Sequence, residues 1–235
     1  MTKEKEIMVA EANACIAAPC APRERPRERI VTAAQDMFHR HGIRGVGVDA
    51  IAEAAGTNKM TLYRHFGSKD DLIIECLNRC AEEANAIWVE IESANPGAPL
   101  AQLRDWIQRA AECVADDDRG CDLANAAVEL TEDGHPALQV IEDFKNRQRD
   151  LLAELCRAAG APQPDLLADA LFLLIEGARV SRRSVGAEGP SAHFVRMSEA
   201  ILNSFGVPSR VRRAGRPQAA VGSSPRLRER AAQGD

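Results

Sequence analysis

The sequence predicts an all-α fold. Alanine is abundant and aromatic residues make up only 4% of the 235 residues, a composition that favours packed helices over sheets. Apolar residues recur at helical spacing, and we find no stretch with the alternation of a half-buried strand. Glycine and proline interrupt this pattern at intervals. With 45% hydrophobic residues and a length sufficient for two modest domains, the chain has the composition of a globular protein.

The first helices of the pattern are short. A stripe of apolar residues predicts a helix over residues 27–41, which Gly42 ends as a C-terminal cap. A second stripe predicts a helix over residues 48–55. Asn58 is a favoured N-cap residue, so a third short helix is expected over residues 59–66.

A long fourth helix follows without a linker. Ser68 and Asp71 have the spacing of a capping box at its start, and its apolar stripe continues through Ile91. The sequence ANPGAP at residues 94–99 ends it. Five further helices are expected between Gly- and Pro-containing breaks, over residues 100–115, 123–130, 136–159, 165–185 and 191–205.

This pattern divides the chain into four segments. Residues 24–74 are predicted to form a helix-turn-helix domain, and residues 75–206 a larger helical domain. Residues 1–23 and 207–235 have no apolar stripe and are predicted to be disordered, the second as a basic tail rich in arginine.

Charge is distributed unevenly along the chain. The formal net charge is −5, but residues 81–206 carry −11, whereas residues 23–80 carry +2 and residues 207–235 carry +5. An acidic block between two basic ones indicates that one part of the protein meets an anion and another does not.

Several classes of protein are disfavoured. No apolar run approaches the length of a membrane span, and the N-terminal residues lack the charged and apolar regions of a signal peptide. The seven cysteines are scattered and odd in number, which argues against a disulfide framework. We therefore expect a cytoplasmic protein without a membrane partner.

The third predicted helix carries an unusual concentration of polar residues. Within GTNKMTLYRHFGSKDDL, residues 56–72, Leu62 and Phe66 share one side of the helix and are expected to be buried. Two short helices joined by a tight turn form a helix-turn-helix pattern, whose second helix enters the major groove of DNA. Its outward side chains offer hydrogen-bond donors for bases and phosphates and methyl groups for thymine. The candidate DNA-binding residues are Lys59, Met60, Thr61, Tyr63, Arg64, His65 and Lys69.

The segment RERIVTAAQDMFHRHGIRGVGVDAIAEAAGTNKMTLYRHFGSKDDLI resembles the N-terminal domain of the TetR family of transcriptional regulators, most specifically in LYRHFGSKDDL. The sequence RGCDLANAAVEL is similar to part of the regulatory domain of some members. The resemblance implies an all-α homodimer that binds double-stranded operator DNA and is usually a repressor released by a small ligand. By position it implies base contacts for Lys59, Met60 and Thr61, and phosphate contacts for Tyr63, His65 and Lys69.

The segment departs from the family pattern in two places. Gly47 and Val48 stand where many members have Thr or Ser at the start of the second helix. Asn58 and Met60 replace the frequent Ser and Gly. The base preference of other members therefore does not transfer to this chain.

The larger domain contains polar residues on helices expected to surround a cavity. Glu176 and Arg179 interrupt the apolar run LLADALFLLIEGA, where they either contact a ligand or form an ion pair at i, i+3 spacing. The helices at 165–185 and 191–205 are the candidate dimer contact, because LFLLIEGA is too apolar to remain exposed. The candidate ligand-binding residues are Trp106, Asn125, Glu129, Phe144, Glu176 and Arg179.

Metal and catalytic chemistry are not indicated. Cys76 and Cys80 share a helix face, but no His or third Cys lies nearby in sequence, so we interpret them as core thiols. The sequence contains no recognisable catalytic triad, phosphate-binding loop or carboxylate pair, and no cofactor is predicted. Three hypotheses remain: a homodimeric repressor released by a ligand, a helical ligand-binding protein whose DNA-binding domain is inactive, and an enzyme. The first fits the residues best.

Overall fold

The computed structural model describes residues 25–116, 119–132 and 134–207, and within these ranges every regular element is a helix. The predicted all-α fold is therefore confirmed. The two predicted tails, residues 1–23 and 207–235, lie outside the described residues, except for Val207. The helices are α2 (Pro26–His41), α3 (Val48–Ala54), α4 (Lys59–Phe66), α5 (Lys69–Ala94), α6 (Pro99–Asp116), α7 (Asp122–Glu129), α8 (Pro136–Ala158), α9 (Pro164–Val185), the 3₁₀ helix η2 (Pro190–His193) and α10 (Phe194–Ser204).

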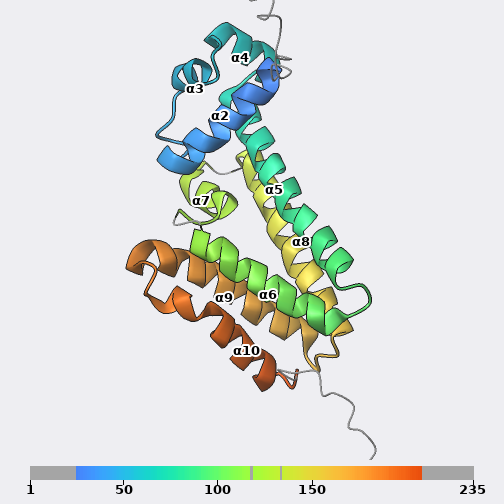
Figure 1. Ribbon diagram of the computed structural model, residues 1–235. Helices are drawn as coiled ribbons and strands as arrows, with labels where there is room; N and C mark the ends of the chain where they lie inside the picture. Colours follow the sequence, from blue (N-terminus) through green and yellow to red (C-terminus); the bar gives the residue numbers. More distant parts are fainter. Residues whose placement is uncertain (1–24, 117–118, 133, 208–235) are drawn as a thin grey trace, which may run out of the picture.

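Two long helices connect the ends of the molecule (Figure 1). Helices α2, α3 and α4 form one end, and α5 and α8 run from there to the other end, where α6, α9 and α10 pack. The short helix α7 lies between α2 and the layer formed by α6 and α9. No helix in the described ranges combines the length and the apolar character needed to cross a bilayer.

The local sequence signals set the helix ends. The side chain of Asn58 accepts a hydrogen bond from the backbone N–H of Thr61 at 2.9 Å and so caps α4. Ser68 and Asp71 form the reciprocal capping box at the start of α5. Gly42 ends α2 with a φ of 76°, a left-handed conformation that favours glycine.

The first core belongs to the helix-turn-helix end. Ile30 and Ala34 from α2, Ile51 from α3 and Leu62 from α4 are all fully buried in it. Cys76 of α5 is buried in the same core, and burial raises the pKa of its thiol. The interpretation of Cys76 as a core residue agrees with this placement.

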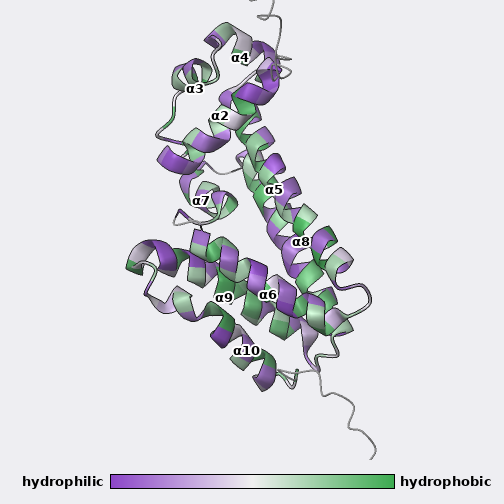
Figure 2. Ribbon diagram, in the orientation of Figure 1, coloured by the Kyte–Doolittle hydropathy of each residue, from purple (hydrophilic) through white to green (hydrophobic). Residues whose placement is uncertain are grey.

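The second core joins α6, α8, α9 and α10 and includes Leu103, Leu152, Leu171 and Phe194. Figure 2 shows the apolar residues of these helices alternating with polar ones along each helix, as expected where one side is buried. Cys156 lies fully buried here, and burial raises the pKa of its thiol to about 12.

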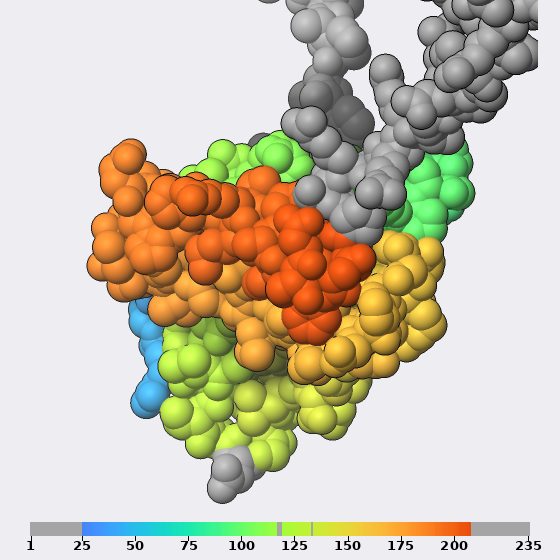
Figure 3. All heavy atoms as spheres, turned by 90° about the horizontal axis from the view of Figure 1, so that it is seen from below, coloured from blue at the N-terminus to red at the C-terminus, as the bar shows by residue number. Residues whose placement is uncertain are grey.

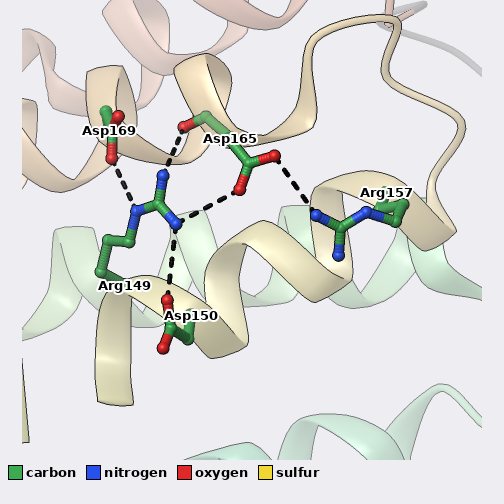
Figure 4. Close-up of polar contacts among 5 residues, drawn as sticks. All are labelled: Arg149, Asp150, Arg157, Asp165 and Asp169. Carbon is green, nitrogen blue, oxygen red and sulfur yellow. Dashed lines mark hydrogen bonds and ion pairs between the residues drawn. The ribbon is translucent and has the colours of Figure 1, made fainter. Parts of the chain in front are cut away.

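A charged cluster ties α8 to α9 at the surface (Figure 4). The Nε atom of Arg149 lies 2.7 Å from Asp169, and its Nη1 atom lies 3.2 Å from Asp165. Arg157 also pairs with Asp165, at 3.3 Å. The hydrogen bond to Asp169 is the main reason that the pKa of Arg149 is raised. Because these groups are solvated, we expect each pair to contribute little stability.

A third core, which we call the bridging core, connects the two ends of the molecule. It combines one residue of the α2–α3 turn with residues of α5, α7 and α8, namely Ile43, Ile73, Leu77, Leu123, Ala126, Ala137 and Ile141. The two ends are thus joined by packed side chains as well as by the backbone of α5.

Two details differ from the sequence predictions. The helix expected over residues 191–205 begins as the 3₁₀ turn η2 and becomes α-helical only at Phe194. Such tighter turns are frequent at helix N-termini. Val207, which was assigned to the disordered tail, is 1% exposed and packs into the second core, so that core extends one residue beyond the predicted boundary.

The first prediction concerns the helix-turn-helix core. Replacing Leu62 by Ala should lower the free energy of unfolding by about 2–5 kcal/mol, because a fully buried leucine leaves a cavity. Met60→Ala on the same helix is the matched control, because Met60 is 83% exposed and its loss should change stability by less than about 0.5 kcal/mol. Urea unfolding followed by circular dichroism measures both; equal losses would contradict the assignment of the buried side.

Candidate functional site

Helix α4 presents one buried and one exposed side. Leu62 and Phe66 are buried beneath it, whereas the outward side chains are exposed or partly exposed. Met60 is 83% exposed and Tyr63 39% exposed. The structure therefore brings the predicted DNA-binding residues of α4 together on one accessible surface, formed by Lys59, Met60, Thr61, Tyr63, Arg64 and His65.

Lys59 is held against the neighbouring helix. Its Nζ atom donates a hydrogen bond to Asp49 of α3 at 3.0 Å, and this bond raises the pKa of Lys59. Both side chains are largely exposed. Because a solvated pair is weak, Lys59 stays available to other hydrogen-bond acceptors.

Lys69 has a partner that its sequence position did not indicate. Its Nζ atom donates to the backbone carbonyl of Ile43 at 2.6 Å and lies 5.9 Å from the ring centre of Phe38. Partial burial lowers the pKa of Lys69. The side chain thus ties the start of α5 to the α2–α3 turn. An ammonium group has three N–H donors, so this bond leaves donors for a further acceptor.

A half-enclosed space lies in the larger domain between α5, α6, α8 and α9. We call it the inner cavity; its volume is about 100 Å³. Four of the six predicted ligand-binding residues line it, namely Trp106, Phe144, Glu176 and Arg179. Its other aromatic and charged lining residues are Trp88, Phe172, Arg109 and Lys145.

Glu176 lies at the centre of the polar part of this cavity. Its carboxylate is 2.7 Å from the Nζ atom of Lys145 and 3.3 Å from an Nη atom of Arg179. The sequence left open whether Glu176 and Arg179 form an ion pair or face a pocket. The structure has the ion pair, and the pair itself faces the cavity.

A second space, which we call the outer groove, runs between α7 and α9. It is lined by Cys121, Asn125 and Val180, and it shares Glu176 and Arg179 with the inner cavity. The predicted residue Asn125 therefore lies next to the cavity rather than in it.

Glu129 does not line either space. Its carboxylate accepts a hydrogen bond from the backbone N–H of Arg44 at 3.0 Å and fills the position next to Gly42 that a Cβ atom would occupy. Sequence position placed Glu129 on a cavity-forming helix, but the orientation of α7 turns it toward the helix-turn-helix end.

Helix α7 makes further polar contacts with α2. Asp122, at the start of α7, lies 2.7 Å from the Nδ1 atom of His39. The guanidinium of Arg119 donates to the backbone carbonyl of His39. Together with Glu129, these residues connect the outer groove to the end of α2 and the turn that follows it.

Three further cysteines of the described ranges, Cys80, Cys113 and Cys121, lie near polar or charged groups. Within the described ranges, no three His, Cys, Asp or Glu side chains are arranged to hold a metal ion. Cys80 is partly buried beside Cys76, and burial raises the pKa of its thiol to about 11. Cys113 and Cys121 instead lie within reach of the cavity cations, with Cys113 Sγ 3.6 Å from Arg179 and Cys121 Sγ 3.7 Å from Lys145.

Sequence reasoning missed Trp88 and Lys145. The indole Nε1 of Trp88 donates to Gln148 at 2.8 Å, and its ring stacks on Trp106 with ring centres 6.4 Å apart. One sequence signal could have identified Trp88. It lies four residues after Ala84, and so continues the row of side chains that Cys76 and Cys80 begin on α5. No local signal distinguished Lys145 from the other charged residues of α8.

Comparison with known proteins shows which proteins this chain is similar to. The sequence model described as "Bacterial regulatory proteins, tetR family" matches residues 30–76, which include α3, α4 and most of α2. The HTH-type transcriptional regulatory protein RaaS of Mycobacterium tuberculosis is 42% identical over 78 residues, covering 33% of this chain and 36% of that protein. This match thus spans about a third of the relative's length.

Two other matches extend beyond the N-terminal domain. The HTH-type transcriptional repressor KstR2 of M. tuberculosis is 27% identical over 159 residues, covering 63% of this chain and 75% of that protein. The crystal structure of SCO4454, a TetR-family transcriptional regulator from Streptomyces coelicolor, superposes with a TM-score of 0.72 at 27% identity and covers 77% of this chain and 95% of that one. The N-terminal domain of this chain thus matches the model of the tetR family of bacterial regulatory proteins, and its overall fold matches that of a TetR-family transcriptional regulator.

Proposed function

We propose that the protein is a homodimeric repressor that binds operator DNA through α4 and is released by a small organic ligand. The observation that carries the proposal is the exposed face of α4, which holds Thr61, Tyr63 and Arg64 on a helix whose other side is locked into the core. A recognition helix needs this combination, because base contacts require side chains fixed in orientation.

The contacts on DNA divide into two kinds. Lys59, Met60 and Thr61, in the first turn of α4, approach base edges, as the N-terminal residues of recognition helices do. Tyr63 and His65 meet phosphates, and Lys69 adds a third phosphate contact with the donors that Ile43 leaves available.

The apolar face of α9 supports the proposed dimer. Leu166, Leu173 and Val180 are 54%, 70% and 68% exposed, and their seven-residue spacing puts them on one side of the helix. Gly177 lies between the last two and has open space beside it, which allows a close approach. Figure 3 shows α9 and α10 side by side on this surface. A second copy of the chain would cover the stripe and place one α4 helix in each of two successive major grooves.

Helix α7 supplies a physical route from ligand to DNA. It borders the outer groove through Asn125 and contacts the α2–α3 turn through Glu129. A ligand that favours a different position of α7 would therefore favour a different orientation of α2, α3 and α4. Release follows if that orientation spaces the two α4 helices wrongly for the operator.

DNA titrations at several salt concentrations test the contacts. Thr61→Ala should weaken binding to the cognate site by about 1–3 kcal/mol and leave binding to scrambled DNA nearly unchanged. Lys69→Ala should weaken binding to both and lower the magnitude of the salt slope by about one unit. Arg147→Ala, which removes an exposed positive side chain from α8, is the control and should change neither. If the two α4-region variants lose cognate and scrambled binding in equal proportion, α4 does not discriminate sequence.

A charge on the apolar face of α9 tests the dimer. Leu173→Glu should give monomers in light scattering and greatly weaken binding to a two-half-site operator, because a carboxylate would be buried in the contact. Val89→Glu is the matched control, since Val89 is similarly exposed, at 68% against 70% for Leu173, but lies on α5. A dimer that survives Leu173→Glu unchanged would rule out this face.

Removing the Glu129 carboxylate tests the route through α7. Glu129→Ala should speed hydrogen exchange at the Arg44 amide and weaken operator binding, because the α2–α3 turn loses its anchor. Glu142→Ala removes the same charge from an exposed position on α8 and should change neither quantity. If the two variants had equal effects, the loss of a negative charge would explain them, and the proposed route through the Glu129 contact would be wrong.

A further inference from the structure

The inner cavity has mostly apolar walls. The rings of Trp88 and Trp106 stack at an interplanar angle of 24°, with Phe144 and Phe172 contributed by the facing helices α8 and α9. Ile175 adds an aliphatic side chain. Walls of this composition favour a ligand with a flat or apolar body.

The side chains that line the inner cavity carry more positive than negative charge. Arg109, Lys145 and Arg179 are cations, and Glu176 is the acid among the lining residues. Arg109 is matched from outside the lining by Asp105 at 3.0 Å and by Glu90 at 2.7 Å. Lys145 and Arg179 instead share Glu176, which leaves one positive charge in excess in a half-enclosed space.

The hydrogen bonds of these two cations are also incomplete. Besides Glu176, Arg179 is directed at the sulfur of Cys113, and Lys145 at the sulfur of Cys121. Sulfur is a weak acceptor, whereas a guanidinium carries five N–H donors and an ammonium three. A carboxylate placed between them would be a stronger acceptor for both.

The opposite ligand class, a lipophilic cation, fits less well. Aromatic rings with one carboxylate can hold a cation. Here the protein itself provides that cation, because the Nζ atom of Lys145 lies 5.6 Å from the ring centre of Phe172 and 2.7 Å from Glu176. A second cation would be repelled by Lys145 and Arg179.

We propose that the inner cavity binds an organic carboxylate with an aromatic or apolar body. Its carboxylate contacts Arg179 and Lys145, and its body lies against the Trp88–Trp106 stack. This inference rests on the proposed release by a ligand and specifies the chemical class of that ligand.

Three probes with one apolar body separate the ligand classes. 3-Phenylpropanoate, 3-phenylpropanamide and 3-phenylpropylamine carry a negative, a neutral and a positive end. Because both tryptophans of the chain line the cavity, tryptophan fluorescence reports binding there directly. The carboxylate should bind at least about tenfold more tightly than the amide, as expected for a charge-assisted hydrogen bond, and the amine should bind most weakly.

Variants that remove one charge from the cavity test whether carboxylate affinity changes in the expected direction. Arg179→Gln and Lys145→Gln should each remove most of the preference for the carboxylate, whereas Glu176→Gln should strengthen carboxylate binding severalfold. Arg157→Gln, in a solvated pair with Asp165 outside the cavity, is the control and should leave it unchanged. Thermal unfolding confirms that each variant is folded. Equal binding of the three probes, absence of carboxylate binding at millimolar concentration, or an amine preference that Glu176→Gln abolishes would overturn the proposal.

A separate measurement distinguishes this proposal from the proposed function. The same carboxylate is added to the protein bound to operator DNA. If the carboxylate binds with the expected dependence on Arg179 but does not alter DNA affinity, the proposed ligand class is supported and the proposed release of DNA through this cavity is wrong. If the amide or the amine releases the DNA instead, release stands and the ligand class fails.

Discussion

Helix α5 is buried on two sides that belong to different cores. Leu72 and Cys76 pack with the helix-turn-helix residues, while Ile73 and Leu77 pack in the bridging core with α7 and α8. Neither set can be satisfied unless the helix keeps both its position and its rotation. The start of α5 is fixed by the capping box at Ser68, so the placement of α4, directly before it, follows from the same helix.

Polar contacts around the bridging core complement this packing. Lys69 bonds to the carbonyl of Ile43, Glu129 to the amide of Arg44, and Asp122 to the ring of His39. The first two bonds hold the same short turn, because they engage the carbonyl and the N–H of the one peptide bond that joins Ile43 to Arg44. Because the apolar contacts are non-directional, these polar contacts determine which of several packed orientations the turn adopts.

Local sequence chemistry predicted the helices well. Asn58, Ser68 and Gly42 act on their own neighbours, so their effect on helix ends can be recognised in one short segment. The exposed face of α4 was predictable for the same reason, since the spacing of Leu62 and Phe66 sets its orientation. These features depend on helical periodicity alone.

Features that depend on how helices rotate against each other were not predictable. Trp106 and Glu176 line the inner cavity, whereas the Glu129 carboxylate lies against the α2–α3 turn, because its direction depends on the rotation of α7. The bond between Lys69 and Ile43 joins residues 26 positions apart and has no sequence pattern. Within the cavity, the excess charge appears only when Lys145 of α8 is brought beside Glu176 of α9.

The contact between Glu129 and Gly42 has a consequence for exchanging domains between relatives. The recognised N-terminal segment, residues 30–76, is the natural unit to transplant. The surface that supports its α2–α3 turn, however, is built by residues 119–129, far downstream in the chain. A chimaera joined at residue 76, with a residue other than glycine at position 42, would bring a Cβ atom to within 2.7 Å of the Glu129 carboxylate, so that the Glu129 side chain would have to move. The unit to exchange between relatives therefore consists of the N-terminal segment and α7, because the two are in contact although they lie far apart in sequence.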